Sequence, residues 1–156
     1  MYKGFTIIEM LIAVAIFVVV ITISLTSFLN ITDVQRKAEA FRSINDNLNF
    51  SLETMAREIR TSTNYNVGTD GTSITVNNAY NENVTYRLNN KRVERSSDGI
   101  NFLAMTAPEI IVTKLLFIKS DLRQPRITII INGSSGTAKT KSYLNLQTTV
   151  SQRKRE

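Results

Sequence analysis

Residues Gly4 to Phe17, GFTIIEMLIAVAIF, begin a long apolar run near the N-terminus of this chain. Glu9 is the only charged residue between Phe5 and Thr32, and the residues from Met10 to Thr32 are uncharged and mostly Val, Ile, Leu, Ala and Phe. A helix rises about 1.5 Å per residue, so this stretch is long enough to cross a hydrocarbon layer about 30 Å thick. The sequence therefore predicts a membrane-spanning helix over residues 5–32.

Glu9 needs an explanation, because an ionised carboxylate in hydrocarbon costs at least about 2–3 kcal/mol and normally has a partner. A secretory signal peptide has a shorter apolar core, of about 7–15 residues, with a small-residue cleavage site after it. A buried core helix of a soluble protein would not be apolar on all sides over 23 uncharged residues. A plain membrane anchor fits the length, but it explains neither Glu9 nor the Gly4-Phe5 pair that precedes the apolar run.

The segment resembles the processing and assembly signal of the type IV pilin and pseudopilin family. Met1-Tyr2-Lys3-Gly4 resembles the short basic leader of that family, which ends in Gly and is removed by a membrane peptidase. Phe5 stands where family members carry their N-methylated new terminus, and Glu9 is the fifth residue after the cut. The resemblance implies cleavage between Gly4 and Phe5, methylation of Phe5, and pairing of Glu9 with the Phe5 amine of a neighbouring subunit.

The composition argues against an enzyme. The 156 residues contain no Cys and no His, which removes disulfides, thiolate nucleophiles, the commonest metal ligand and the usual general base. The Gly residues form no phosphate-binding motif, and no acidic cluster resembles the calcium loop of major pseudopilins. We therefore expect no catalytic residue, no cofactor and no metal.

The net charge of +6 raises the question of nucleic-acid binding. The basic residues gather in two groups, Arg87, Lys91, Arg92 and Arg95 and the terminal Arg153-Lys154-Arg155. Several Lys and Arg on one face would suit phosphate contacts. However, Glu94 and Glu156 interrupt the two groups, and no base-stacking motif accompanies them. We favour a solvated cationic surface and keep DNA binding as the alternative.

The helical period continues beyond Thr32 with a different composition. One apolar series has a spacing of seven residues: Val34, Phe41, Leu48 and Met55. A second series has the same spacing, Ala38, Leu52 and Ile59, and is interrupted at Asn45, where Ile44 is the neighbouring apolar residue. Charged residues occupy the other side: Arg36, Lys37, Glu39, Arg42, Asp46, Glu53, Arg57 and Glu58. We expect an amphipathic helix over 33–60 that packs on a sheet, with a coiled coil as the alternative. No Pro or Gly lies between Phe5 and Arg60, so one helix of roughly 80 Å is possible.

The remaining chain predicts antiparallel strands. Residues 61–73 read as a loop, residues 74–150 as a sheet and residues 151–156 as a basic tail. Alternation marks the strands around Ile74, Tyr86, Ile129 and Leu146, with a hairpin turn at Asn89-Asn90 and a polar connection at Asp121 to Pro125. Five or six antiparallel strands and one helical stripe make a single α+β domain over 33–156.

This architecture matches the pilin-like fold that the N-terminus implies, a long N-terminal helix packed on an antiparallel sheet. Leu52 to Arg60, LETMAREIR, and Leu146 to Ser151, LQTTVS, also resemble the larger minor pseudopilins of the J type. Unlike many major pilins, the chain has neither Gly nor Pro from Val20 to Phe28. Whether this part of the helix melts on assembly is left open by the sequence.

The resemblance implies a structural role, as a minor subunit of a type II secretion pseudopilus or a type IV pilus. The implied partners are other pilin-like subunits, the prepilin peptidase, the cytoplasmic membrane, and an assembly platform and motor. The leader would lie in the cytoplasm and the sheet domain outside, with exposed apolar residues from Phe102 to Met105 as candidate protein contacts. The alternative is a minor pilin whose exposed domain binds DNA or a surface.

Overall fold

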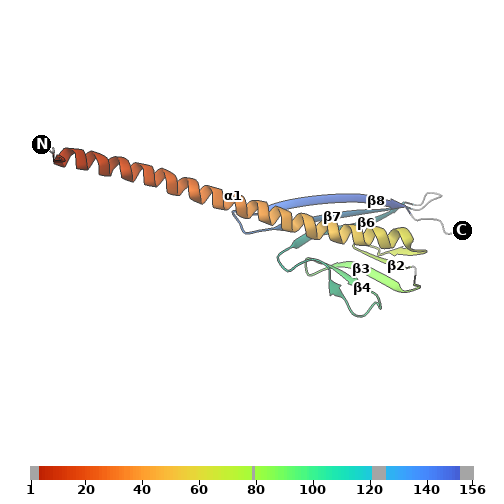
Figure 1. The fold of residues 1–156 in the computed structure, drawn as a ribbon. Coiled ribbons are helices and arrows are strands. Elements are labelled where there is room, and N and C mark those ends of the chain that lie inside the picture. Colours follow the sequence, from red (N-terminus) through yellow and green to blue (C-terminus); the bar gives the residue numbers. More distant parts are fainter. Residues whose placement is uncertain (1–3, 79, 121–125, 152–156) are drawn as a thin grey trace. The chain divides into compact units, whose positions relative to one another are not determined.

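The computed structural model describes residues 4–78, 80–120 and 126–151, which form one helix and eight strands (Figure 1). The helix α1 spans Ile7–Thr61. The strands are β1 (Tyr65–Val67), β2 (Ser73–Asn77), β3 (Asn83–Asn89), β4 (Arg92–Ser96), β5 (Leu103–Ala104), β6 (Ile111–Ser120), β7 (Arg126–Ser135) and β8 (Ser142–Ser151). The chain divides into two compact units, Met1–Arg36 and Lys37–Glu156, and α1 contributes to both.

The first unit is helical from Ile7 onward. Within the described residues, α1 is the single helix that is long and apolar enough to cross a membrane. Hydroxyl side chains inside this apolar stretch donate hydrogen bonds to the carbonyl oxygen four residues earlier, as from Thr22 to Val18 at 2.8 Å and from Ser24 to Val20 at 2.8 Å. These bonds satisfy polar groups that hydrocarbon could not solvate.

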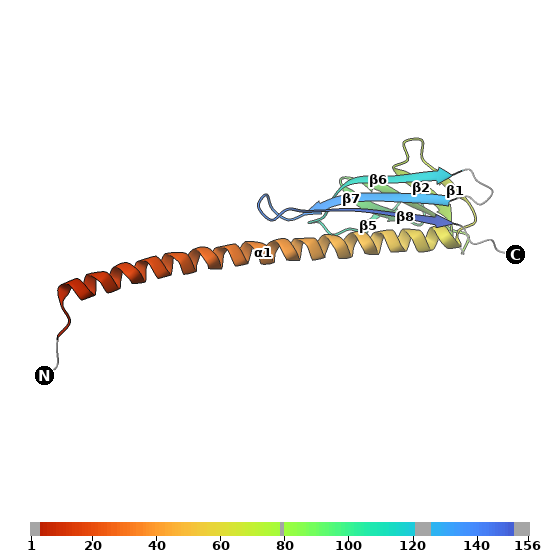
Figure 2. The same ribbon diagram turned by 90° about the horizontal axis from the view of Figure 1, so that it is seen from above.

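The second unit contains two antiparallel sheets. One has the strand order β1-β2-β3-β4-β5, and the other has the order β6-β7-β8. Figure 2 shows β7 and β8 running alongside the yellow end of α1. The sheets meet at β6, where the Val112 N–H donates to the Lys91 carbonyl and the Phe117 N–H to the Gly71 carbonyl, each at 2.8 Å.

Gly71 is required where the turn before β2 meets β6. Its φ of +71° lies in the left-handed region that favours glycine. A Cβ at this position would stand 2.9 Å from Leu116 Cδ1 and 3.2 Å from the Phe117 carbonyl oxygen. Because the neighbouring atoms include backbone, a side chain here would push the turn away from β6.

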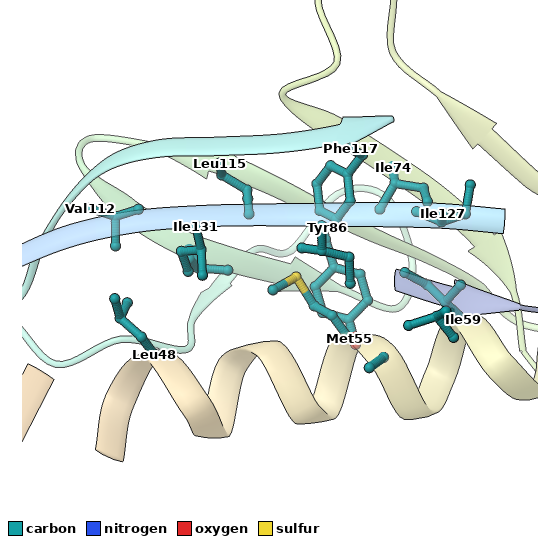
Figure 3. Packing of buried hydrophobic residues seen from close by; sticks show 14 of the residues in the cluster. Leu48, Met55, Ile59, Ile74, Tyr86, Val112, Leu115, Phe117, Ile127 and Ile131 are labelled. Atoms are coloured by element: carbon teal, nitrogen blue, oxygen red, sulfur yellow. The ribbon is translucent and has the colours of Figure 1, made fainter. Parts of the chain in front are cut away.

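The core of the second unit lies between α1 and the two sheets. Four apolar residues on one side of α1 are fully buried: Ile44, Leu48, Met55 and Ile59. Figure 3 shows Leu48, Met55 and Ile59 pointing toward side chains of both sheets, among them Tyr86 and Ile131. Burying such side chains is worth about 1.5–3 kcal/mol each, so this contact is the main reason that the helix and the sheets form one unit.

The expected α+β fold is confirmed, as are the uninterrupted helix and the hairpin between β3 and β4. The two central turn residues are Asn90 and Lys91, with φ of 46° and 61°. Positive φ at both positions is typical of a type I′ turn, whose twist suits a two-residue hairpin. The turn therefore lies one residue later than the Asn89-Asn90 pair predicted.

The structure differs from the sequence-based expectation in the arrangement of strands. Eight described strands form two sheets, where five or six strands in one sheet were expected. The predicted loop 61–73 contains the short strand β1, which pairs with β2 from Tyr65 to Val67. Alternation reveals which face of a strand is buried, but it does not reveal which strands pair. The polar connection from Asp121 to Pro125 and tail residues 152–156 lie outside the described residues.

The apolar stripe of α1 also differs in extent. Its buried positions begin at Ile44, whereas Val34 is 68% and Phe41 47% exposed. The apolar stripe of α1 therefore extends further toward the N-terminus than the part of the helix that the sheets bury. Glu58, predicted on the solvent side, instead bonds to Tyr86 and Arg95 of the five-stranded sheet.

Candidate processing and assembly site

The junction between Gly4 and Phe5 lies ahead of the helix and makes few contacts. Residues 4–6 precede α1, and Phe5 is 89% exposed. A Cβ built on Gly4 would have no atom of the described chain within 4 Å. Nothing in the described chain shields this peptide bond, so a protease could reach it.

Glu9 closes a capping box at the start of α1. Its Oε2 accepts hydrogen bonds from the Thr6 backbone N–H and the Thr6 hydroxyl, both at 2.9 Å. The Glu9 N–H in turn donates to the Thr6 hydroxyl at 3.3 Å. A Thr cap and a Glu three residues later satisfy backbone donors that the first helical turn would otherwise leave unbonded. The carboxylate also lies at the positive end of the helix dipole.

The Thr6-x-x-Glu9 spacing is visible in the sequence, but the family resemblance implies only an assembly role for Glu9. The structure adds a local role for the same carboxylate. Among the described residues, Glu9 Oε1 makes no hydrogen bond, so the group can accept a further donor. The capping box also holds the carboxylate close to Phe5, because Phe5 directly precedes Thr6.

The helix that follows exposes apolar side chains around its circumference. Ile8, Met10, Leu11 and Ile12 are successive or nearly successive in sequence, and each is more than half exposed. A soluble helix would carry polar residues on part of this surface. The exposed apolar surface is suited to lipid or to the apolar helices of other subunits.

The predicted basic group on β3 and β4 does not form a free cationic patch. Arg87 Nε lies 2.8 Å from Glu94 Oε2, and the Arg87 guanidinium stacks 3.4 Å from the Phe102 ring centre. Arg95 Nη2 lies 2.8 Å from Glu58 Oε1. Two of the four cations are therefore neutralised within the chain. The second basic group, Arg153 to Arg155, lies outside the described residues.

The predicted contact segment from Phe102 to Met105 divides into two parts. Leu103 is 76% exposed and lies in the short strand β5. Met105 is partly buried and packs against the core. No three His, Cys, Asp or Glu side chains of the described segments gather closely enough to hold a metal ion.

Comparison with known proteins identifies the N-terminal segment. Residues 1–25 match the family model of the prokaryotic N-terminal methylation motif. No curated protein and no solved structure gives a significant match to the chain. The matched segment includes Gly4, Phe5 and Glu9, and its residues 7–25 form the start of α1. The chain thus carries a prepilin-type methylation motif ahead of a pilin-like α+β fold.

Proposed function

We propose that this protein is a structural minor subunit of a type IV pilus or a type II secretion pseudopilus. The observation that carries the proposal is the methylation motif over residues 1–25, which continues without a break into a helix with an exposed apolar surface. The subunit waits in the cytoplasmic membrane, and the prepilin peptidase cuts after Gly4. Phe5 becomes the methylated N-terminus, and subunits assemble by packing their apolar helices together.

Glu9 changes its partners in this mechanism. Before assembly its carboxylate caps the helix through Thr6. In the filament, Glu9 Oε1 is available to accept a hydrogen bond from the Phe5 amine of a neighbouring subunit. Both charges would then lie in an apolar helix bundle, where an unpaired buried charge costs about 3–5 kcal/mol. This penalty would select the axial register in which each Glu9 meets an amine.

The resemblance of Leu52 to Arg60 and of Leu146 to Ser151 to J-type minor pseudopilins supports the secretion pseudopilus as the setting. DNA capture is the alternative function. The ion pairs of Arg87 and Arg95 weigh against it, because they remove half of the basic group on β3 and β4.

The test compares Glu9→Leu with Glu9→Gln in cells that assemble the filament. Gln can still close a capping box, but it has no charge to pair with an amine. If charge pairing sets the register, both variants reach the membrane at normal levels and both enter filaments at least about tenfold less than the original chain. The measurement is the ratio of subunit in sheared, purified filaments to subunit in membranes. Normal incorporation of Glu9→Gln would show that only capping matters, and it would contradict the proposed pairing.

A further inference from the structure

We propose that the free edge of β8 binds an extended, acidic segment of a partner protein as an additional strand of the three-stranded sheet. The inference concerns the second unit alone, and it does not depend on how the N-terminus is processed. It rests on three observations: the protection of the other sheet edges, the composition and exposure of β8, and the distribution of charge around that strand.

The other sheet edges are short, irregular or occupied. The edge strands of the five-stranded sheet, β1 and β5, have only three and two residues. The edge strand β6 is interrupted by a register shift between Val112 and Lys114. The N–H groups of Val112 and Phe117 on β6 also donate to the carbonyls of Lys91 and Gly71. These features are the usual ways in which proteins prevent an edge from recruiting further strands.

Strand β8 has none of these protections. It pairs with β7 in an unbroken register over ten residues, from Ser142 to Ser151. Its sequence, SYLNLQTTVS, contains no charged residue, no Pro and no Gly. Among the described residues, its backbone hydrogen bonds run to β7 only. A long, regular, uncharged edge strand of this kind readily adds another strand.

The helix does not close this edge. The start of β8 contacts α1 through the Ser142 hydroxyl, which donates to the Lys37 carbonyl at 3.2 Å. Further along, Leu144, Leu146 and Thr148 belong to the inner face of the sheet, yet their side chains stay partly exposed. The corresponding side chains on β7, Ile129 and Ile131, are fully buried. The exposure therefore begins at β8, and an added strand would cover it.

The charge around β8 indicates the chemistry of the partner. Residues 110–120 and 126–151 contain no Asp or Glu. Arg126, Lys139 and Lys141 lie near β8, whereas Lys114 and Lys119 lie on β6 at the opposite edge of the sheet. Lys139 and Lys141 precede β8, and Arg126 lies at its far end, paired with Ser151. All three side chains are exposed. A strand with acidic residues at both ends would be attracted to these positions, whereas a second copy of this sheet would be repelled.

Binding would follow the strand-addition mode. Backbone hydrogen bonds to β8 would supply affinity, and side chains in alternating positions would supply specificity. Tyr143, Asn145 and Gln147 alternate on the exposed outer face and would line the added strand. Lys141 Nζ lies 5.3 Å from the Tyr143 ring centre, so one flanking cation is already held beside the edge.

The test uses the full chain in detergent micelles and two synthetic peptides. Each peptide has about ten alternating Thr and Val residues, flanked at both ends by two Glu in one peptide and two Lys in the other. Surface charge pairs contribute about 0.2–1 kcal/mol each, so we expect the Glu-flanked peptide to bind about fivefold or more tightly than the Lys-flanked peptide. Hydrogen exchange should slow in β8 on binding, because its outward N–H groups gain partners.

A matched pair of variants locates the site. Lys141→Glu places a carboxylate beside β8, and Lys91→Glu makes the same change of charge in the exposed turn between β3 and β4. We expect Lys141→Glu to abolish or reverse the preference for the Glu-flanked peptide and Lys91→Glu to leave it within about twofold. Equal binding of both peptides, or slowed exchange at β1 in place of β8, would overturn the proposal. Self-association of the full chain through β8 without peptide would also overturn it.

Discussion

Glu58 connects α1 to the five-stranded sheet through two side chains. Its Oε2 accepts a hydrogen bond from the Tyr86 hydroxyl, and its Oε1 pairs with Arg95 at 2.8 Å. Burial raises the pKa of Tyr86, and the bond to Glu58 raises it further, so the phenol stays protonated and keeps donating. The three side chains fix the last turns of α1 against β3 and β4.

We expect Tyr86→Phe to lower the free energy of unfolding by about 1 kcal/mol. The variant removes one donor from Glu58, but Arg95 Nε still lies 3.4 Å from Oε2, so the carboxylate is not left unpaired. Tyr143→Phe is the matched control, because Tyr143 is 66% exposed and such changes usually stay within about 0.5 kcal/mol. The free energy of unfolding of both variants is measured by urea unfolding, with the circular dichroism of the tyrosine side chains as the signal. Equal stability of the two variants would contradict the role given to the Tyr86 hydroxyl.

For single residues, contacts between sequence neighbours could be predicted and contacts with distant partners could not. The capping box joins residues three apart, and a Thr-x-x-Glu pattern before an apolar run is a known signature. Glu58 joins residues that lie 28 and 37 positions away. Helical periodicity predicts Glu58 on the charged side opposite the apolar stripe, and only the tertiary fold reveals its partners Tyr86 and Arg95.

The turn between β4 and β5 is organised by Asp98. Its carboxylate accepts bonds from the backbone N–H groups of Asn101 at 2.8 Å and Ile100 at 2.9 Å, and from the Ser96 hydroxyl at 2.8 Å. These bonds, with that from Asn101 the largest cause, hold the pKa of Asp98 well below its usual range. The turn carries the exposed Ile100, whose backbone N–H is one of the donors to Asp98, so Asp98 helps to fix the position of this side chain.

We expect the order of this turn to depend on pH in one direction. Because the pKa of Asp98 is lower in the folded turn than in the unfolded chain, the ionised carboxylate stabilises the turn fully at pH values above the unfolded pKa of about 3.9. This stabilisation is lost as the pH falls toward the folded pKa. Amide protection factors of Ile100 and Asn101 should therefore stay constant from neutral pH to about pH 5 and decrease only below about pH 4. In the Asp98→Asn variant these amides should have lower protection factors, and the decrease below about pH 4 should be absent. The same decrease in Asp98→Asn would show that another group causes it.

At the element scale, the helix and most strands follow from periodicity, because each pattern is local. The length of α1 follows from the absence of Gly and Pro, and the β3–β4 hairpin from alternation around a turn. The short strand β1 has too few residues to show a period. The way in which the two sheets meet depends on contacts such as that of Gly71 with β6, which no local pattern encodes.

On the scale of the whole molecule, the second unit contains its own core. All of its buried apolar residues lie at or after Ile44. We therefore expect a chain that begins at Asp33 to fold and stay soluble without the membrane helix. A chain that begins at Asn49 is the control, because it lacks Ile44 and Leu48, which pack against the sheets. It should unfold or aggregate. Analytical ultracentrifugation would show whether each chain stays soluble, and circular dichroism would show whether it folds. Aggregation of both chains would contradict the prediction that the second unit folds independently.

Processing at Gly4-Phe5 is the step by which we propose that the chain becomes a filament subunit. The intact mass of protein from native membranes tests whether this processing occurs. We predict loss of Met1 to Gly4 and addition of one methyl group on Phe5. Gly4→Leu should block the cut, and because Gly4 contacts nothing in the described chain, such a block would report on the peptidase. An uncut, unmethylated N-terminus in cells with an active prepilin peptidase would contradict the proposed processing.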